Sequence, residues 1–197
     1  MIEFKISITG TAPLLMHSAR LANPLDPTAR AVKKISAKRL KTEEDYEEMA
    51  RLEHAGALYL IPGVGPYLPG ENIARCLVDA ARITKQGVKV SRGVLVTTDE
   101  NPISYKGPRT ADALWENENF RLIAPVKIGT ARIMRTRPMF REWVLEAEGI
   151  LDPAVINLDD LADIATTAGQ MIGLGDWRPR YGRFTANLTR ISKKVAA

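Results

Sequence analysis

The sequence predicts an α+β fold built on an antiparallel sheet, and three observations support this class. Residues 2–9 alternate apolar and polar side chains, which is typical of a half-buried strand. Residues 71–85 and 159–172 carry apolar side chains at helical spacing. The chain has 197 residues, of which 45% are hydrophobic and 26% are charged. This composition is that of a globular protein long enough to bury its own core.

The elements follow from apolar alternation for strands, 3.6-residue spacing for helices, and Gly or Pro clusters for turns. Thr42 and Asp45 have the spacing of a capping box, which opens an acidic helix that Gly56 is expected to end. In chain order we expect a strand over 2–9, an irregular segment over 10–27, a basic arm over 28–41, a helix over 43–54, extended pieces over 57–61 and 67–70, a helix over 71–85, strands over 88–98 and 102–105, a short helix over 112–116, an antiparallel pair over 120–133 and 142–150 joined by 134–141, a helix over 159–172, a loop over 173–182 and a strand over 184–191.

This order of elements is a strand, a helix, a strand pair, a helix and a last strand. It is typical of a βαββαβ unit of the ferredoxin-like or RRM-like kind. We therefore expect one domain over residues 1–197, enlarged by insertions at about 16–56 and 87–119.

Cysteine and histidine are too few to cross-link the chain through a disulfide or a zinc ion. Cys76 is the single cysteine and stands among apolar residues at helical spacing, which favours simple burial. The two histidines, His17 and His54, complete no Cys/His zinc cluster. We expect no metal and no cofactor. No signal-peptide pattern and no run of roughly 18 apolar residues occurs, so we expect a cytoplasmic protein without a membrane partner.

The net charge of +5, from 28 Lys and Arg against 23 Asp and Glu, is unevenly distributed. The arm at 28–41 and the segment at 121–141 contain no acid, whereas the helix at 43–54 is strongly acidic. Acid-free basic stretches suit a nucleic-acid backbone. In the alternative, the basic arm pairs with the adjacent acidic helix, and the arginines of 121–141 are only solvated.

The most informative segment is 173–184, which combines glycines, arginines and aromatic residues. Glycines allow close backbone approach, arginines bind phosphates, and aromatic faces stack on unpaired bases. In the alternative, Gly173 ends a helix and the loop packs locally. The segment is not a Walker A motif or a dinucleotide fingerprint. The candidate nucleic-acid-binding residues are Gly173, Gly175, Trp177, Arg178, Arg180, Tyr181, Gly182 and Arg183, with Arg132, Arg135, Arg137, Lys33, Lys34, Lys38 and Arg39.

Three segments resemble the RAMP superfamily of CRISPR-associated proteins, in the order that the family shows. Residues 67–75 resemble the segment that opens its first helix, 173–184 its C-terminal glycine-rich loop, and 6–15 its first strand followed by a Pro-Leu pair. The resemblance implies an RRM-like protein that binds single-stranded RNA and self-associates, or joins other effector subunits, as a backbone subunit on a guide RNA. It also implies that Asn72 and Arg75 lie near the RNA backbone.

The main alternative to a protein that only binds RNA is an enzyme that cleaves it. Some members of that superfamily cleave RNA through an N-terminal histidine or a loop aspartate with a metal ion, and His17 and Asp26 follow the first strand. A lone histidine is more often structural, and Asp before Pro commonly makes a turn. We therefore predict a non-catalytic binder. An endoribonuclease acting on single-stranded or hairpin RNA, and a protein-interaction module, remain open, as does RNA against single-stranded DNA.

Overall fold

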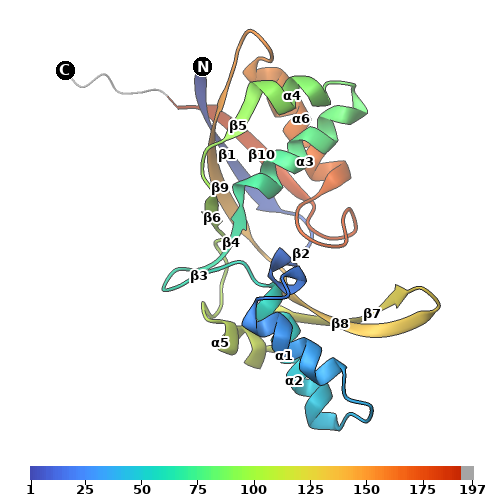
Figure 1. Cartoon of the computed structure of the whole chain (residues 1–197). Helices are drawn as coiled ribbons and strands as arrows, with labels where there is room; N and C mark the ends of the chain where they lie inside the picture. Colours follow the sequence, from blue (N-terminus) through green and yellow to red (C-terminus); the bar gives the residue numbers. More distant parts are fainter. Residues whose placement is uncertain (192–197) are drawn as a thin grey trace. The chain divides into compact units, whose positions relative to one another are not determined.

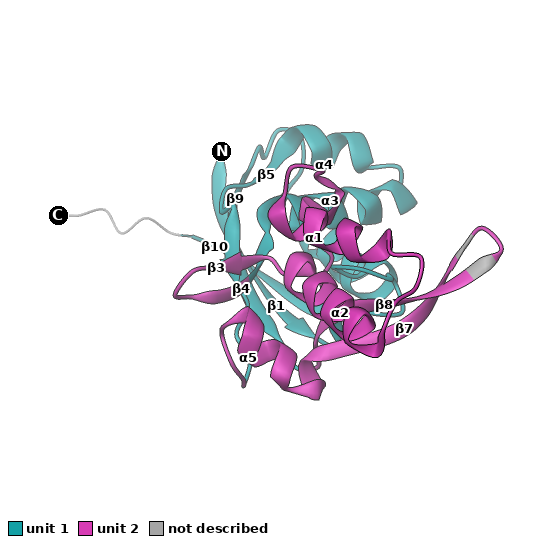
Figure 2. Ribbon diagram, turned by 60° about the horizontal axis from the view of Figure 1, so that its bottom comes forward, with its two compact units in different colours: residues 1–14, 67–106, 142–197 teal, residues 15–66, 107–141 magenta. Residues whose placement is uncertain are grey.

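The computed structural model describes residues 1–191, apart from the side chains of Ile128 and Ala131 (Figure 1). The chain divides into two compact units, coloured separately in Figure 2. Unit 1 comprises residues 1–14, 67–106 and 142–197, and unit 2 comprises residues 15–66 and 107–141. Two short strands, β2 (Leu14–Leu15) and β4 (Gly65–Pro69), span the boundaries between the units in the sequence.

Unit 1 contains a four-stranded sheet of β1 (Ile2–Gly10), β5 (Val94–Val96), β9 (Val144–Leu151) and β10 (Phe184–Arg190). Its order is β10-β1-β9-β5, and every neighbouring pair is antiparallel. The predicted α+β class with antiparallel pairing is thereby confirmed. Counted along the chain, the four strands lie in the order fourth, first, third, second.

Two helices lie on one side of this sheet, α3 (Gly70–Ile83) and α6 (Leu158–Thr167) (Figure 1). The core side chains of β1 alternate as predicted, with Phe4, Ile6 and Ile8 fully buried. Cys76 is buried on α3, and desolvation raises the pKa of its thiol to about 12. The thiol therefore stays protonated at neutral pH, as expected of a cysteine used for packing.

The predicted strand over 88–98 is partly wrong. The helix α4 (Gly87–Gly93) occupies its first half, and β5 follows. Val88 and Val90 favour a strand locally, but Val90 is buried in the helix, so tertiary packing outweighs propensity. The strand expected at 102–105 is β6 (Glu100–Pro102), which pairs with the part of β4 that belongs to unit 1.

Unit 2 consists mostly of helices and a β-hairpin. It contains η1 (Ala19–Ala22), α1 (Pro27–Ser36), α2 (Glu43–Ala57), β3 (Leu60–Ile61), α5 (Ala111–Glu116) and η2 (Glu118–Phe120). The capping box of Thr42 and Asp45 at the start of α2 is confirmed. The helix ends at Ala57, one residue past Gly56. A Cβ at Gly56 would lie 2.4 Å from Leu21 Cδ2, so the glycine permits close packing there.

The predicted pairing of 120–133 with 142–150 is also wrong. The hairpin of unit 2 consists of β7 (Arg121–Ile128) and β8 (Ala131–Phe140), whereas β9 pairs with β1 and β5 in unit 1. Gly129 occupies the turn at φ +59°, a conformation that glycine adopts readily. The arginine-rich residues 134–140, expected as a connection, are therefore a strand. No helix within residues 1–191 is long and apolar enough to cross a membrane.

His54 is a buried titratable group of unit 2. Its Nε2 donates to the Phe120 carbonyl oxygen at 3.0 Å, and its ring meets Trp115 edge-on at 5.7 Å between centroids. The Nδ1 atom is buried and has no hydrogen-bond partner. Burial lowers the pKa of His54, the Phe120 carbonyl opposes this, and the charge of Arg121 lowers it further. The ring is therefore neutral in the folded state.

Unfolding raises the pKa of His54 to its usual value near 6.5, so the unfolded chain binds a proton first as the pH falls. The neutral, buried His54 ring therefore contributes its full share of the stability above pH 6.5. This contribution is lost as the pH falls from 6.5 through the lower pKa of His54 in the folded state. We expect the free energy of unfolding, from urea titrations between about pH 7.5 and about pH 5, to fall with acidification. His54→Gln should remove this contribution and His17→Gln should retain it. An identical pH slope in the wild type and His54→Gln would contradict the assignment.

Candidate nucleic-acid interface

The loop over 173–183 is held to the end of β1 by backbone hydrogen bonds within unit 1. The Leu174 N–H donates to the Gly182 carbonyl at 2.8 Å, and the Gly182 N–H donates to the Pro13 carbonyl at 2.8 Å. The Thr11 N–H donates to the Arg183 carbonyl at 2.8 Å. The loop therefore closes on itself and on the residues just after β1. Its position is fixed by the fold before any ligand binds.

The glycines of the loop are needed for this closure. Gly173, Gly175 and Gly182 have φ angles of +80°, +78° and +72°. A Cβ at Gly182 would lie 1.7 Å from the Leu174 carbonyl oxygen, and one at Gly173 would lie 2.9 Å from that of Tyr181. No larger residue fits at position 182 without moving the backbone.

Two of the glycine N–H groups are already used in the fold. The Gly173 N–H donates to the Ala168 carbonyl, at the end of the π-helical turn η3 (Ala168–Ile172), and the Gly182 N–H donates to Pro13. The sequence suggested that these glycines bring their N–H groups to a ligand. In the structure they instead shape the loop that presents its side chains.

Aromatic and basic side chains of the loop lie together. The rings of Trp177 and Tyr181 have centroids 6.1 Å apart at 59°, and both residues are half-buried. The guanidinium carbon of Arg180 lies 5.8 Å from the centre of the Tyr181 ring. Arg180 and Arg183 are exposed. The loop thus offers ring faces and positive charge over adjacent positions.

Asp79 of α3 gathers three arginines. Its carboxylate accepts from Arg75 Nε at 3.0 Å and from Arg82 Nη1 at 2.8 Å, and it lies 4.0 Å from Arg178 Nη2. Arg178 Nη1 also donates to the Gly173 carbonyl at 3.4 Å. The structure therefore brings the predicted Arg75 and Arg178 together. It adds Arg82, which the sequence signals only by the spacing of Arg75, Asp79 and Arg82 on one helical face.

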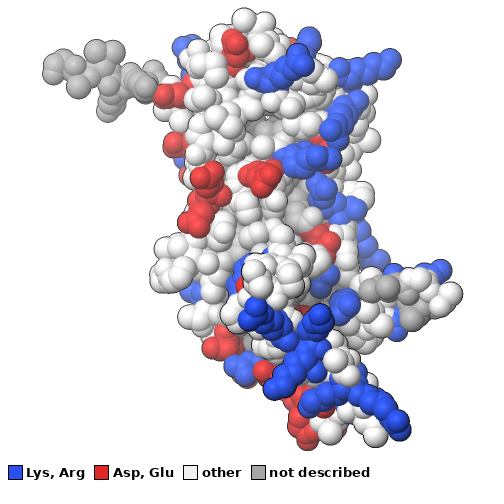
Figure 3. Space-filling model, in the orientation of Figure 1, with Lys and Arg blue, Asp and Glu red and all other residues white. Residues whose placement is uncertain are grey.

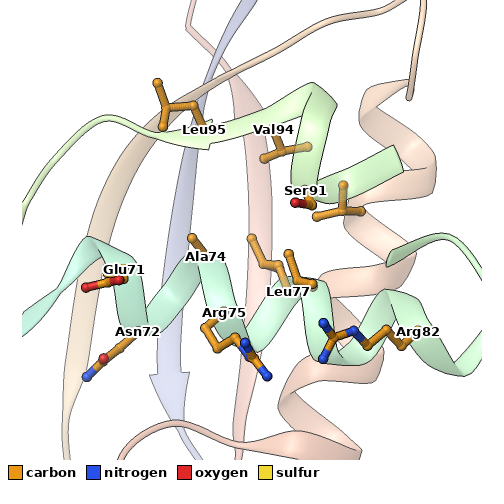
Figure 4. A pocket seen from close by; sticks show the side chains of 11 residues that line it. Glu71, Asn72, Ala74, Arg75, Leu77, Arg82, Ser91, Val94 and Leu95 are labelled. Carbon is orange, nitrogen blue, oxygen red and sulfur yellow. The ribbon is translucent and has the colours of Figure 1, made fainter. Parts of the chain in front are cut away.

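A groove of about 570 Å³ runs beside α3, between that helix and the segment formed by α4 and β5. The predicted Asn72 and Arg75 both line it, as does Arg82 (Figure 4). The guanidinium ends of Arg75 and Arg82 point toward one another in this view. In the space-filling view, Lys and Arg side chains gather over α3 (Figure 3).

In unit 2 the basic arm forms α1 and the segment after it. Lys33, Lys34, Lys38 and Arg39 are all exposed. Lys38 forms an ion pair with Asp45 at 2.5 Å, at the start of the acidic helix. Within residues 1–191, the other three of these basic side chains form no ion pair. Within the described residues, Lys38 is thus the one of these four side chains that pairs with the acidic helix, and the charge of Lys41 also acts on Asp45.

The three predicted arginines of the hairpin differ in their surroundings. Arg132 is exposed. Arg135 forms an ion pair with Glu53 of α2, whose carboxylate is buried. Arg137 is only 7% exposed, donates to the Thr136 carbonyl at 3.1 Å and lies 3.5 Å from His17 Nδ1. Arg137 is therefore buried in unit 2, and Arg135, whose side chain is 31% exposed, is held by Glu53, so the interface proposed below excludes both.

Of the two catalytic candidates, Asp26 has a structural role and His17 lies exposed. Asp26 is the N-cap of α1 and accepts from the N–H groups of Thr28 at 2.8 Å and Ala29 at 3.2 Å. Desolvation opposes ionisation of Asp26, but these bonds and one from Arg20 outweigh it and lower its pKa. The expected turn at Asp26 is thus a helix cap. His17 is exposed, and the described residues hold no cluster of three metal-ligating side chains.

Comparison with known proteins assigns this chain to no family. No family model matches the chain, and no curated protein matches it. Among solved structures, one titled "Crystal structure of Cmr4" aligns with 96% of this chain and 100% of that chain. The TM-score is 0.42 and the sequence identity is 7%. Because both values are low, the proposals below rest on the residues of this chain.

Replacing Gly182 by alanine tests whether the loop depends on its closure. The positive φ alone costs about 1–2 kcal/mol for a residue with a Cβ. Gly63→Ala is the matched control, because Gly63 has φ +76° and a Cβ at that position would have no neighbour within 4 Å. In urea unfolding we expect Gly182→Ala to lose clearly more stability than Gly63→Ala, because of the contact with the Leu174 carbonyl. Equal losses would show that the loop relaxes freely.

Proposed function

We propose that the chain binds single-stranded nucleic acid, with RNA as the expected ligand, through a surface of unit 1. We call it the arginine surface. It consists of Arg75, Arg82, Trp177, Arg178, Arg180, Tyr181 and Arg183. The observation that carries the proposal is the meeting of three arginines at Asp79, beside a loop that presents two aromatic rings.

The charge on this surface remains largely uncompensated. Asp79 supplies one negative charge against three guanidinium groups, and among the described residues Arg180 and Arg183 form no ion pair. Guanidinium groups bind phosphates through paired N–H donors. Aromatic rings stack on bases of any sequence once those bases are unpaired. Together these features favour a single strand over a duplex.

The topology of unit 1 supports an RRM-like interpretation. The strand order fourth, first, third, second, with α3 between the first two strands and α6 between the last two, is that of two interleaved split β-α-β units. We propose that this is a ferredoxin-like core, and that the chain is one domain into which unit 2 is inserted.

The family assignment is part of the same proposal. Two of the segments that resemble the RAMP superfamily, 67–75 and 173–184, come together in unit 1, where Arg75 of the first and Arg178 of the second both pair with Asp79. We propose a cytoplasmic, non-catalytic subunit of the RAMP type that acts with other effector subunits. The capping role of Asp26 supports binding without cleavage.

The double variant Arg180→Ala/Arg183→Ala tests the arginine surface. Each phosphate contact on a single strand contributes about 0.7 to the slope of log K against log salt. We expect weaker binding of a fluorescein-labelled RNA oligonucleotide in anisotropy titrations, and a slope smaller by about 1.4. The control Lys106→Ala/Arg190→Ala removes the same charge from exposed positions elsewhere in unit 1 and should bind as the wild type. If both variants bind alike, the surface is wrongly placed.

Trp177→Ala tests base stacking. Loss of one stacked base costs about 1–3 kcal/mol of binding free energy. In the wild type we expect RNA to quench the tryptophan emission, because Trp177 is half-buried whereas Trp143 and Trp115 are 2% and 7% exposed. The variant should bind more weakly and show no quenching. Full quenching that persists in the variant would mean that the ring is not in contact with a base.

A further inference from the structure

The groove beside α3 has an acidic end and a basic end, and we call it the α3 groove. Its volume of about 570 Å³ lies in the range of about 300–1,000 Å³ that is usual for ligand pockets. All of its lining residues belong to unit 1. Glu71 lies near the start of α3 and Arg82 near its end, so they mark the two ends of the helical wall (Figure 4). The groove therefore suits a ligand with a negative group at one end and hydrogen-bond donors at the other.

The helical wall of the groove consists of residues on one face of α3. Glu71, Ala74, Val78 and Arg82 follow one another at intervals of three or four residues, and all four line the groove. At a rise of about 1.5 Å per residue, the Cα atoms of Glu71 and Arg82 are about 16 Å apart. The Arg82 guanidinium points back along the helix toward Arg75, which brings its charge closer to Glu71 (Figure 4). The space between the two ends suits one nucleotide.

The middle of the groove is apolar. Ala74 and Val78 line it on the side of α3, and Val90, Val94 and Leu95 line it on the side of α4 and β5. Leu95 is 56% exposed, so this apolar surface is open to a ligand. The flat faces of a nucleobase would cover these aliphatic side chains and remove them from water, whereas a ribose or a phosphate would not. The part of a nucleotide that fits the middle of the groove is therefore its base.

The acidic end of the groove selects among the bases. Glu71 is exposed, and within residues 1–191 its carboxylate forms no ion pair. A carboxylate accepts hydrogen bonds through two oxygens side by side. Guanine presents two adjacent donors, N1–H and the N2 amino group, on its Watson–Crick edge. Adenine and cytosine place an acceptor beside their donor, and uracil has one donor between two carbonyl groups, so guanine is the base that matches Glu71.

The basic end of the groove offers donors for a phosphate. Arg75 and Arg82 both line the groove and both donate to Asp79, which orients them and leaves further N–H groups free. Their side chains are 61% and 58% exposed. Both also belong to the arginine surface, so a strand that lies on this surface passes the groove.

We propose that the α3 groove holds one guanosine residue of the bound strand, with its guanine edge on Glu71 and its phosphate on Arg82. This inference rests on the proposed function, because the arginine surface has to bring the strand to the groove. It adds a preference for one base at one position of the strand. Glu71 is then the residue that determines specificity, while the arginines bind phosphates of any sequence.

Changes in the RNA test the preference on the wild-type protein. The ligands are a short fluorescein-labelled oligouridine and the same RNA with one guanosine in its middle, titrated by anisotropy. A paired contact to one base is worth about tenfold in affinity, so the guanosine RNA should bind about tenfold more tightly. Inosine at the same position lacks the N2 amino group and should lose most of this advantage. Adenosine, a purine without the paired donors, controls for stacking and should also lack it.

Changes in the protein test the residues of the groove. Glu71→Gln should abolish the advantage of the guanosine RNA but leave the binding of oligouridine, because one of the two acceptors becomes a donor. Glu148→Gln removes the same charge from an exposed position of β9 and should keep the preference. Ala74→Leu fills the middle of the groove and should lose it. Ala162→Leu, at a half-buried alanine of α6 outside the groove, should keep it. Circular dichroism verifies that each variant is folded.

Three results would overturn this inference and leave the proposed function intact. They are equal binding of all four RNAs, a guanosine preference that persists in folded Glu71→Gln and Ala74→Leu, and Glu71-dependent binding of free guanosine monophosphate without any preference among the RNAs. The last result would mean that the groove takes a free nucleotide. A wild type that binds none of the RNAs would instead contradict the proposed function and this inference together.

Discussion

The pairing of β1 on both of its edges is the constraint on which unit 1 depends. Its residues pair with β9 along one edge and with β10 along the other, so the first strand of the chain lies inside the sheet. The residues that follow β1 anchor the 173–183 loop through the Thr11 N–H and the Pro13 carbonyl. The strand that organises the core therefore also places the loop that we assign to the ligand.

Local patterns in the sequence predict the parts of this fold that local physics decides. The alternation in β1 follows from burial of one face, and the cap of α2 follows from two side chains three residues apart. The hairpin and α4 are different, because they depend on partners distant in the sequence. Arginine-rich residues 134–140 resemble a solvated connection until β7 is known to lie beside them.

The candidate site likewise combines features that the local sequence predicts with features that depend on residues distant in the sequence. Composition indicates that 121–141 is basic, but only the fold shows that Glu53 lies against Arg135 and that Arg137 is buried. Conversely, the sequence offers no strong reason to choose Arg82, which becomes part of the site through Asp79. A stretch without acids is thus not the same as a stretch with free positive charge. What separates them is burial and the position of carboxylates elsewhere in the chain.

Asp79 also has a consequence for the thermodynamics of binding. A free arginine loses much of its rotamer freedom when a phosphate immobilises it, at a cost of about 0.5–1.5 kcal/mol for each side chain. Arg75, Arg82 and Arg178 are already oriented by the Asp79 carboxylate. Part of the conformational entropy of these side chains is therefore lost when unit 1 folds, and less remains to be lost when a ligand arrives.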